Sequence, residues 1–283
     1  MSPNRAVRDH FVAVNGLRLA YRDWGNAHAP ALLCLHAGAC HSHWWNEIAA
    51  PLADRYHVIT PDLRGHGNSA RSDAGDYGFD TYASDVAALI EALAVEDVCL
   101  VGHSLGAYVG LVYASRRPRR LVALVIADML CELDPAALDR VHEASRRPSP
   151  TFATREEAES RFRLQPPETV ARPEILALLT REAVAQTPDG RFGFKFDRRA
   201  MGHPPIRAWD VAPNVACPTL VVRGERSSLM PRDHAERLAT LVPHGRLREV
   251  AGAYHHLMLD NPRDFTAALD EFLSSRPTTR LLA

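Results

Sequence analysis

The stretch VCLVGHSLGAYVGLV, residues 98–112, decides the fold of this protein. Its first four residues form a short apolar run, which is typical of a strand buried on both faces. The pentapeptide Gly102-His103-Ser104-Leu105-Gly106 follows at once, and an apolar helix comes next. A serine between two glycines at a strand-to-helix turn lifts its hydroxyl above the sheet, and small neighbours let strand and helix approach closely. Ser104 is therefore the candidate nucleophile; a helix-capping role for it would not explain both glycines.

The same strand-and-helix rhythm continues on both sides of this stretch. A hairpin is predicted first, because residues 11–14 and 17–21 alternate in polarity around Asn15-Gly16, a turn pair that tolerates positive φ. Short apolar runs then predict parallel strands, and amphipathic stretches between them predict helices. The strands are expected at 31–35, 57–60, 98–101, 121–127, 219–222 and 247–250, and the clearest helices at 80–93 and 262–272. The fold class is α/β: a doubly wound, mostly parallel sheet with an N-terminal antiparallel hairpin.

One long segment interrupts this alternation of strands and helices. From residue 131 to residue 215 the sequence has no clear buried strand, only charged helical stretches and several prolines. This is too long for a simple loop. We interpret 131–215 as a mostly helical lid inserted into one core, which consists of residues 1–130 and 216–283. The strands expected after it complete the same sheet, so a separate second domain is the weaker interpretation.

The charge and residue composition of the chain limit the kinds of molecule that it is expected to bind. The chain has 33 Lys plus Arg against 34 Asp plus Glu, a net charge of -1, so no overall field holds it on nucleic acid or an acidic membrane. No apolar stretch reaches the roughly 20 residues that span a bilayer. Five cysteines without a CxxC pair indicate reduced thiols. We expect a cytoplasmic protein that acts on a small-molecule substrate, with no nucleic acid and no membrane as partner; a homo-oligomer stays open.

Acyl transfer at Ser104 needs donors for the negative charge that develops on the substrate oxygen. One donor is normally the backbone N–H after the nucleophile, here that of Leu105, and the second comes from the loop after an earlier strand. In His36-Ala37-Gly38-Ala39 small residues allow the main chain to approach a ligand. Gly38 is the favoured second donor and Ala39 the alternative, although an ordinary glycine-bearing turn fits the spacing equally well.

These motifs resemble the α/β-hydrolase superfamily over nearly the whole chain, from about residue 11 to residue 273. His36-Ala37-Gly38 is similar to the oxyanion loop of that family, with Ala37 in place of the usual glycine. Residues 61–69, PDLRGHGNS, resemble its Asp-x-Arg-Gly-x-Gly-x-Ser turn, which is structural. The resemblance therefore assigns no catalytic role to Asp62, Arg64 or His66.

The resemblance also selects the general base from 14 histidines. The family places its catalytic histidine in a loop after the last strand, within Gly-x-x-His and shortly before a proline that starts a helix. In residues 251–262, AGAYHHLMLDNP, this position is His255. His256 is the runner-up and a candidate for the pocket wall.

The third residue departs from the commoner family pattern. The usual acid follows the strand at 219–222 within Gly-x-x-Asp, but that position here is Ser227, which cannot stabilise an imidazolium as a carboxylate does. A variant of the superfamily takes its acid from the end of the strand after the nucleophile helix. The run 121–127 ends at Asp128, at the carboxyl edge of the sheet where α/β sites form. Asp128 is the expected acid, and Glu225 is its rival.

The pocket is less clearly marked in the sequence. Its candidate residues are Ala39, His103, Trp44, Trp45 and His256. Lid arginines such as Arg161, Arg163 and Arg191 are candidates for binding a substrate carboxylate, although such residues more often form a solvated face.

The resemblance implies a hydrolase that cleaves a small ester, lactone or amide through an acyl-Ser104 intermediate, with no metal and no organic cofactor. Within the superfamily, the motifs are most similar to hydrolases of small acids, amides or lactones. A cofactor-free oxygenase, a carbon-carbon bond hydrolase and a non-catalytic ligand receptor of the same fold are the alternatives.

Overall fold

The computed structural model describes residues 7–275, and residues 1–6 and 276–283 lie outside the described part. An eight-stranded sheet crosses the molecule in the order β1-β2-β4-β3-β5-β6-β10-β11. Its strands are β1 (Arg8–Val14), β2 (Leu17–Asp23), β3 (Ala31–Leu35), β4 (His57–Pro61), β5 (Val98–His103), β6 (Leu121–Ala127), β10 (Thr219–Gly224) and β11 (Gly245–Val250). Strands β1 and β2 form the predicted antiparallel hairpin, and β2 also runs antiparallel to β4. The remaining pairs are parallel, which confirms the expected fold class.

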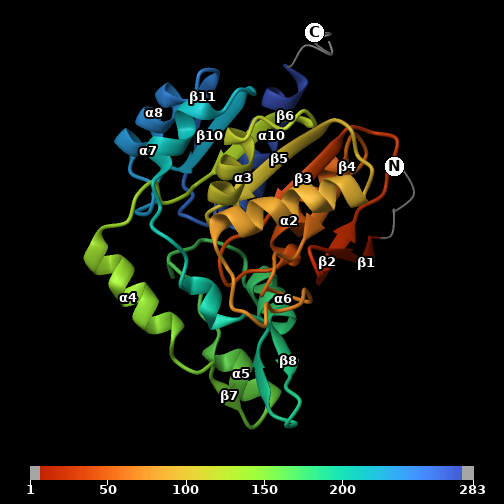
Figure 1. Ribbon diagram of the computed structural model, residues 1–283, viewed down its shortest axis with the longest axis vertical. Helices are drawn as coiled ribbons and strands as arrows, with labels where there is room; N and C mark the ends of the chain where they lie inside the picture. The colour runs from red at the N-terminus through yellow and green to blue at the C-terminus, as the bar shows by residue number, and fades with distance from the viewer. Residues whose placement is uncertain (1–6, 276–283) are drawn as a thin grey trace.

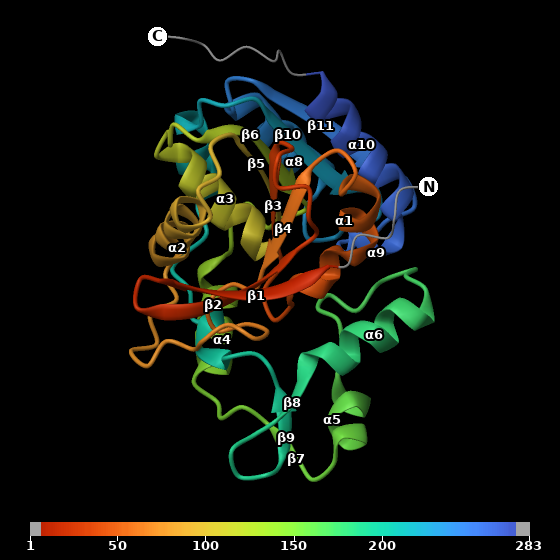
Figure 2. The same cartoon turned by 90° about the vertical axis from the view of Figure 1, so that its right-hand side faces the viewer.

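Helices cover both faces of this sheet. They are α1 (Asn46–Leu52), α2 (Phe79–Ala92), α3 (Leu105–Ser115), α8 (Arg232–Leu241), α9 (Leu257–Asp260) and α10 (Pro262–Ser274). Figure 2 shows α2 and α3 on one side of the strands and α1, α9 and α10 on the other. Each central strand contributes side chains to the cores on both faces of the sheet, because successive side chains point to opposite faces. In β5, Leu100 packs with the α2 and α3 side, whereas Cys99 and Val101 pack with the α1 and α10 side.

The C-terminal edge strand differs from the sequence-based expectation. Residues 247–250 were expected to form a strand buried on both faces, but within β11 only Val250 is buried. Strand β11 pairs with β10 on one side and is the last strand of the sheet. An edge strand is covered less completely than a central one, so its exposed positions carry charges such as Arg246 and Arg248.

Most of the segment between β6 and β10 lies beside the carboxyl ends of the parallel strands, below the sheet in Figure 1, whereas its last helix lies beside α8. It contains α4 (Pro135–Ser145), α5 (Arg155–Arg161), α6 (Pro173–Ala183) and α7 (Ala208–Val211). The prediction of a mostly helical segment missed a three-stranded antiparallel sheet of β7 (Thr151–Phe152), β9 (Phe192–Phe194) and β8 (Val184–Gln186). These strands have two or three residues each, too short for a periodic signal. The predicted lid was 131–215; because α7 (208–211) packs against α3 and α8, we use the name lid below for residues 131–207 of that segment.

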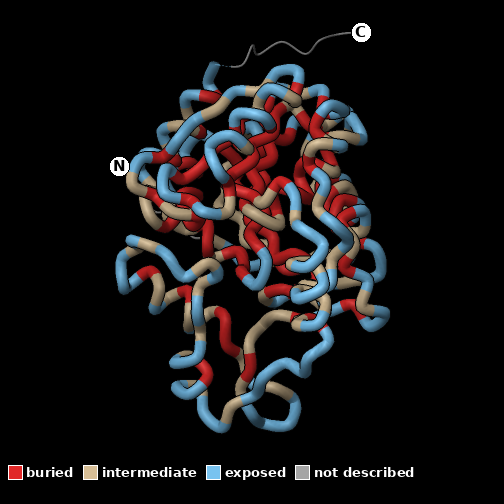
Figure 3. Tube along the Cα trace, turned by 90° about the vertical axis from the view of Figure 1, so that its left-hand side faces the viewer, coloured by how far each residue is buried: buried red, intermediate tan, exposed pale blue. Residues whose placement is uncertain are grey.

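The lid is more exposed than the sheet, as the colouring of Figure 3 shows. It is joined to the core through backbone hydrogen bonds from the turn at residues 61–69. The Gly67 N–H donates to the Lys195 carbonyl at 2.8 Å, and the Asp197 N–H donates to the Gly65 carbonyl at 2.8 Å.

None of the helices within residues 7–275 is long and apolar enough to cross a membrane.

Candidate active site

The turn between β5 and α3 places Ser104 in a strained conformation, with φ of 52° and ψ of -113°. A residue with a side chain adopts positive φ only at a cost, and such strain is concentrated at functional sites. The flanking glycines make the turn possible, because a Cβ at Gly102 would lie 2.2 Å from the Gly106 carbonyl oxygen. Ser104 lines a cavity of about 530 Å³ between the core and the lid.

Gly106→Ala is expected to lower the free energy of unfolding by about 1–3 kcal/mol. A Cβ at Gly106 would lie 2.4 Å from the Leu35 carbonyl oxygen, and backbone atoms cannot move aside as a flexible side chain can. Urea unfolding followed by circular dichroism measures the change. Gly78→Ala is the control, because the nearest atom to its added Cβ is 3.7 Å away. Equal stability of the two variants would contradict the close approach of helix α3 to strand β3.

His255 and Asp128 form a buried pair beside this turn. The His255 Nδ1–H donates to Asp128 Oδ1 at 2.8 Å, and the two side chains are 1% and 0% exposed. With Nδ1 as the donor, Nε2 carries the lone pair, and this buried atom has no hydrogen-bond partner among the described residues. A neutral imidazole with a free Nε2 lone pair is the state that a general base needs.

The carboxylate of Asp128 accepts two further hydrogen bonds. The Ser227 hydroxyl donates to Oδ1 at 2.7 Å, and the Gly224 N–H donates to Oδ2 at 2.8 Å. Burial raises the pKa of Asp128 to about 7, and these two donors oppose the rise because they stabilise the ionised form. Burial also lowers the pKa of His255 well below its ordinary value, and neighbouring His256 adds to the shift. The His255 imidazole is therefore held neutral. It lies next to the Asp128 carboxylate, which accepts hydrogen bonds from Ser227 and Gly224.

The rival acid lies elsewhere. The carboxylate of Glu225 is on an exposed side chain and accepts from the Gly252 N–H at 2.7 Å, so it closes the turn after β11. Ser227 occupies the position where the commoner pattern has the acid, and the structure brings it against Asp128. The sequence excluded Ser227 as an acid but did not predict it as a hydrogen-bond partner of Asp128, although its place in that motif was an available signal.

The expected oxyanion donors lie together at the cavity. Gly38 and Leu105 both line it, and a Cβ at Gly38 would lie 4.0 Å from the Leu105 side chain. Among the described residues, no protein acceptor bonds the N–H of Gly38, Ala39 or Leu105. His36 holds this loop: its Nδ1–H donates to the Ala37 carbonyl at 2.7 Å, and its Nε2 accepts from the Leu63 N–H at 2.9 Å. Burial lowers the pKa of His36 to about 4, so the ring is neutral and can do both.

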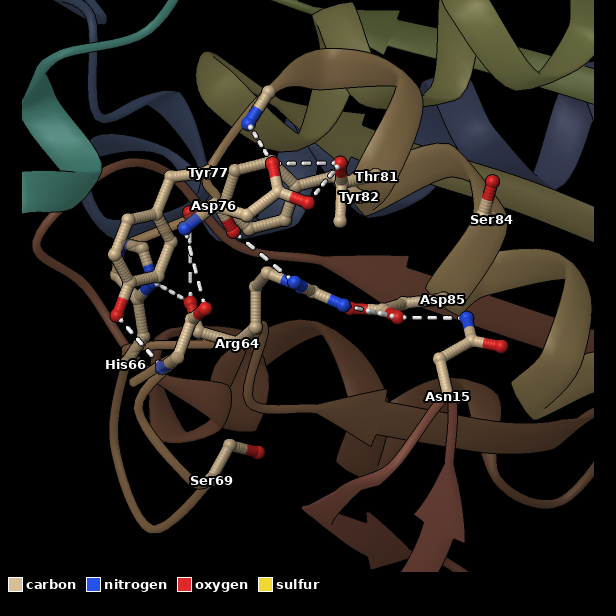
Figure 4. Close-up of polar contacts among 12 residues, drawn as sticks. Asn15, Arg64, His66, Ser69, Asp76, Tyr77, Thr81, Tyr82, Ser84 and Asp85 are labelled. Atoms are coloured by element: carbon tan, nitrogen blue, oxygen red, sulfur yellow. Dashed lines mark hydrogen bonds and ion pairs between the residues drawn. The ribbon is translucent and has the colours of Figure 1, made fainter. Parts of the chain in front are cut away.

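The turn at residues 61–69 is a support for the site. Arg64 and Asp85 form a bidentate pair, with Nε and Nη2 at 2.5 and 2.7 Å from the two carboxylate oxygens, and Asn15 donates to the same carboxylate (Figure 4). The carbonyl of Arg64 accepts from His66 Nδ1 at 2.8 Å. Asp62 accepts from the backbone N–H groups of Ser42 and Asn68 at 2.6 and 2.8 Å. These bonds hold the shape of the turn, which is consistent with a structural role. His66 also lines the cavity, and its Nε2 has no partner among the described residues.

The expected pocket residues divide into two groups. Ala39 and Trp44 line the cavity, but Trp45, His103 and His256 do not. Trp45 is fully buried in the core on the α1 side and faces Phe265, at a centroid distance of 6.4 Å. His103 donates through Nε2 to the His255 carbonyl at 3.0 Å, and His256 donates to the Pro166 carbonyl of the lid at 2.8 Å. None of these three is therefore part of the cavity lining: Trp45 packs in the core, and His103 and His256 bond backbone carbonyls beside the site.

The three histidines near the site are also the candidate metal cluster among the described residues. Ring nitrogens of His103, His255 and His256 lie within 4.8 Å of one another. Each ring uses one nitrogen in a hydrogen bond to the protein, with the His255 carbonyl, Asp128 and Pro166 as acceptors. His255 Nε2 and His256 Nδ1 are left without a protein partner. The arrangement fits a base positioned by its neighbours better than it fits a closed set of metal ligands.

Comparison with known proteins places this geometry in context. The family model described as alpha/beta hydrolase fold matches residues 30–262. An uncharacterized protein of Mycobacterium tuberculosis is 39% identical over 128 residues, a match that spans 43% of this chain and 37% of that relative. The 2-(acetamidomethylene)succinate hydrolase of Mesorhizobium japonicum is 29% identical over 94% of this chain and 97% of its own length.

Two further similarities point to the same architecture. The 1H-3-hydroxy-4-oxoquinoline 2,4-dioxygenase of Pseudomonas putida is 35% identical over 46% of this chain and 49% of its own length. The crystal structure of an E-2-(acetamidomethylene)succinate hydrolase superposes with a TM-score of 0.83 at 25% identity, covering 95% of this chain and 100% of that chain.

Proposed function

Because the chain belongs to the alpha/beta hydrolase fold family, we propose that it is a serine hydrolase that cleaves a small ester, lactone or amide through an acyl enzyme. The proposal rests above all on the His255–Asp128 pair. Because His255 Nδ1 donates to Asp128, its buried Nε2 carries the free lone pair and can act as the base. The Mesorhizobium relative, which is named as a hydrolase and matches nearly the whole chain, supports the reaction class. It does not identify the bond that this chain cleaves, so the type of bond is part of the proposal.

In the proposed mechanism, Ser104 Oγ attacks the substrate carbonyl carbon while His255 Nε2 takes the hydroxyl proton. Asp128 accepts from Nδ1–H and stabilises the imidazolium that forms. The N–H groups of Gly38 and Leu105 bind the oxyanion. The tetrahedral intermediate expels the alcohol or amine, which leaves with the proton from His255. Water then attacks the acyl-Ser104 ester, giving up a proton to His255, which returns it to the departing Ser104 Oγ as the acid product is released.

A cofactor-free oxygenase is a second candidate, and the similarity to the Pseudomonas dioxygenase is the observation that favours it. In that reaction the histidine would take a proton from a heteroaromatic substrate, and no acyl enzyme would form. The hydrolase is preferred because the match to the dioxygenase spans 46% of this chain, whereas the match to the Mesorhizobium hydrolase spans 94%.

A paired assay distinguishes the two candidates. We expect short p-nitrophenyl esters to be hydrolysed, and a fluorophosphonate to label Ser104 and stop this hydrolysis, because the elbow serine is nucleophilic only with its base in place. Intact-protein and peptide mass spectrometry locate the label. Oxygen consumption with hydroxylated quinolones is measured in parallel. Oxygen uptake without ester turnover would overturn the hydrolase proposal in favour of the oxygenase.

A further inference from the structure

The cavity at Ser104 has an unbalanced charge. Among the described residues that line it, four carry positive charge, and none is Asp or Glu. The cationic residues all belong to the lid: Arg161, Arg163, Lys195 and Arg198. The chain as a whole has a net charge of -1, so this concentration of positive charge is a local property of the cavity.

The arginines of this group lack a carboxylate to neutralise them. Arg163 Nη1 donates to the carbonyls of Ser160 and Phe162, and Arg198 Nε donates to the Ala144 carbonyl at 3.2 Å. Within residues 7–275, none of the ion pairs formed by the protein includes Arg161, Arg163 or Arg198. Lys195 is the exception, because Glu182 lies 3.9 Å from its Nζ. Carbonyl groups orient a guanidinium but leave its full charge in place.

Arg198 is the best placed of the three arginines. It is half-buried, whereas Arg161 and Arg163 are exposed, and a less hydrated guanidinium interacts more strongly with an anion. Its single bond through Nε fixes the side chain to α4, and Nη1 and Nη2 form no hydrogen bond within the described protein. Two parallel N–H groups are the arrangement that binds a carboxylate in bidentate fashion.

The remaining wall restricts what can lie between Ser104 and these cations. It is largely apolar, with side chains that include Phe79, Leu133, Phe194, Phe196 and Met201. A cavity of about 530 Å³ suits a small molecule. The lid sequence had suggested carboxylate binding by Arg161, Arg163 and Arg191; Arg191 instead bonds Thr151 within the lid sheet and does not line the cavity.

On the basis of the proposed function, we propose that the substrate is a small acid whose free carboxylate is bound by Arg198, while its scissile carbonyl lies at Ser104. A short apolar chain would separate the two groups and contact the aromatic wall. Arg161 and Arg163 add positive potential that attracts the anion into the cavity. Arg198 is thus a specificity-determining residue of the lid.

A matched pair of esters tests this assignment. Mono-p-nitrophenyl glutarate and p-nitrophenyl pentanoate have acyl chains of equal length and differ in a terminal carboxylate or methyl group. We expect kcat/KM to favour the glutarate by at least about tenfold once rates without enzyme are subtracted. Arg198→Gln should remove most of this preference by raising KM for the glutarate, and should change kcat/KM for the pentanoate by less than about twofold.

Two variants control for folding and for charge alone. Arg198→Lys keeps the charge but not the bidentate geometry, so it should restore part of the preference. Arg140→Gln removes an exposed lid arginine that does not line the cavity and should leave the preference unchanged. A faster reaction with the pentanoate, or an equal loss on both esters in Arg198→Gln, would overturn the proposal.

Binding without turnover separates this proposal from the proposed function. Calorimetry with glutarate and with neutral glutaramide on the Ser104→Ala variant should detect tighter binding of glutarate, by about tenfold or more, and Arg198→Gln in that background should remove the difference. Preferential glutarate binding by a chain that hydrolyses no ester would sustain the anion site and sink the hydrolase. Ester hydrolysis with equal binding of both probes would do the reverse.

Discussion

Ser104→Ala is expected to lower kcat/KM for a short p-nitrophenyl ester by about 10⁴- to 10⁶-fold. The substitution removes the only atom that can form the acyl intermediate in the proposed mechanism, while the oxyanion donors and the cavity stay in place. Residual hydrolysis would come from those donors acting on bound water. Steady-state kinetics on the purified variant measure the loss, with rates without enzyme subtracted.

Two controls separate chemistry from folding in this experiment. Alanine relieves little of the backbone strain at this turn, so the melting temperature of Ser104→Ala should stay near that of the parent protein. Ser115→Ala changes a serine at the far end of the same helix and should keep near-normal activity, because within residues 7–275 its hydroxyl bonds only the Val112 carbonyl. Near-normal rates in Ser104→Ala would refute an acyl-Ser104 mechanism.

Asp128→Asn is expected to reduce kcat by about 10³- to 10⁴-fold with a small effect on KM. The carboxylate accepts from His255 Nδ1, Ser227 and Gly224, and an amide can replace only part of that acceptor capacity. An amide N–H facing His255 would favour the tautomer with the proton on Nε2, which cannot take the serine proton. The imidazolium would also lose its compensating charge.

Glu225→Gln is the matched change for the rival acid. Its carboxylate accepts from the Gly252 N–H, and the amide oxygen of glutamine can still do so, so kcat should change by less than about threefold. Kinetics of both variants on one ester, with circular dichroism to verify folding, rank the two acids. A larger loss in Glu225→Gln than in Asp128→Asn would transfer the role of the acid to Glu225.

Local pattern was enough to predict most of the sheet. The runs 31–35, 98–101 and 121–127, which lie in β3, β5 and β6, are apolar at every position because both faces of a central strand are covered. The Asn15-Gly16 turn adopts the positive φ that its residues favour. The short strands of the lid were missed because two or three residues contain no period. The exposed face of β11 was missed because its edge position depends on the order of strands in space.

The candidate site was predictable to the extent that its signals are local. The turn that holds Ser104 requires Gly102 to lie close to Gly106, four residues later at the start of α3. This requirement for small residues can be read from the sequence itself. The acid was a harder case. Asp128 lies 127 residues before His255 and 99 residues before Ser227, so nothing in its own surroundings in the sequence shows that the three side chains meet.

The sequence by itself thus determined most of the main sheet, the glycine-flanked turn at Ser104 and a short set of candidate residues for a base and an acid, because short-range sterics and burial periodicity govern these features. Tertiary structure alone decided which of those side chains meet, that Ser227 bonds Asp128, that Trp45 packs into the core, and that Arg198 lines the cavity. The physical reason is that hydrogen bonds and charge compensation act between atoms close in space. Chain folding brings those atoms together across separations that no local pattern encodes.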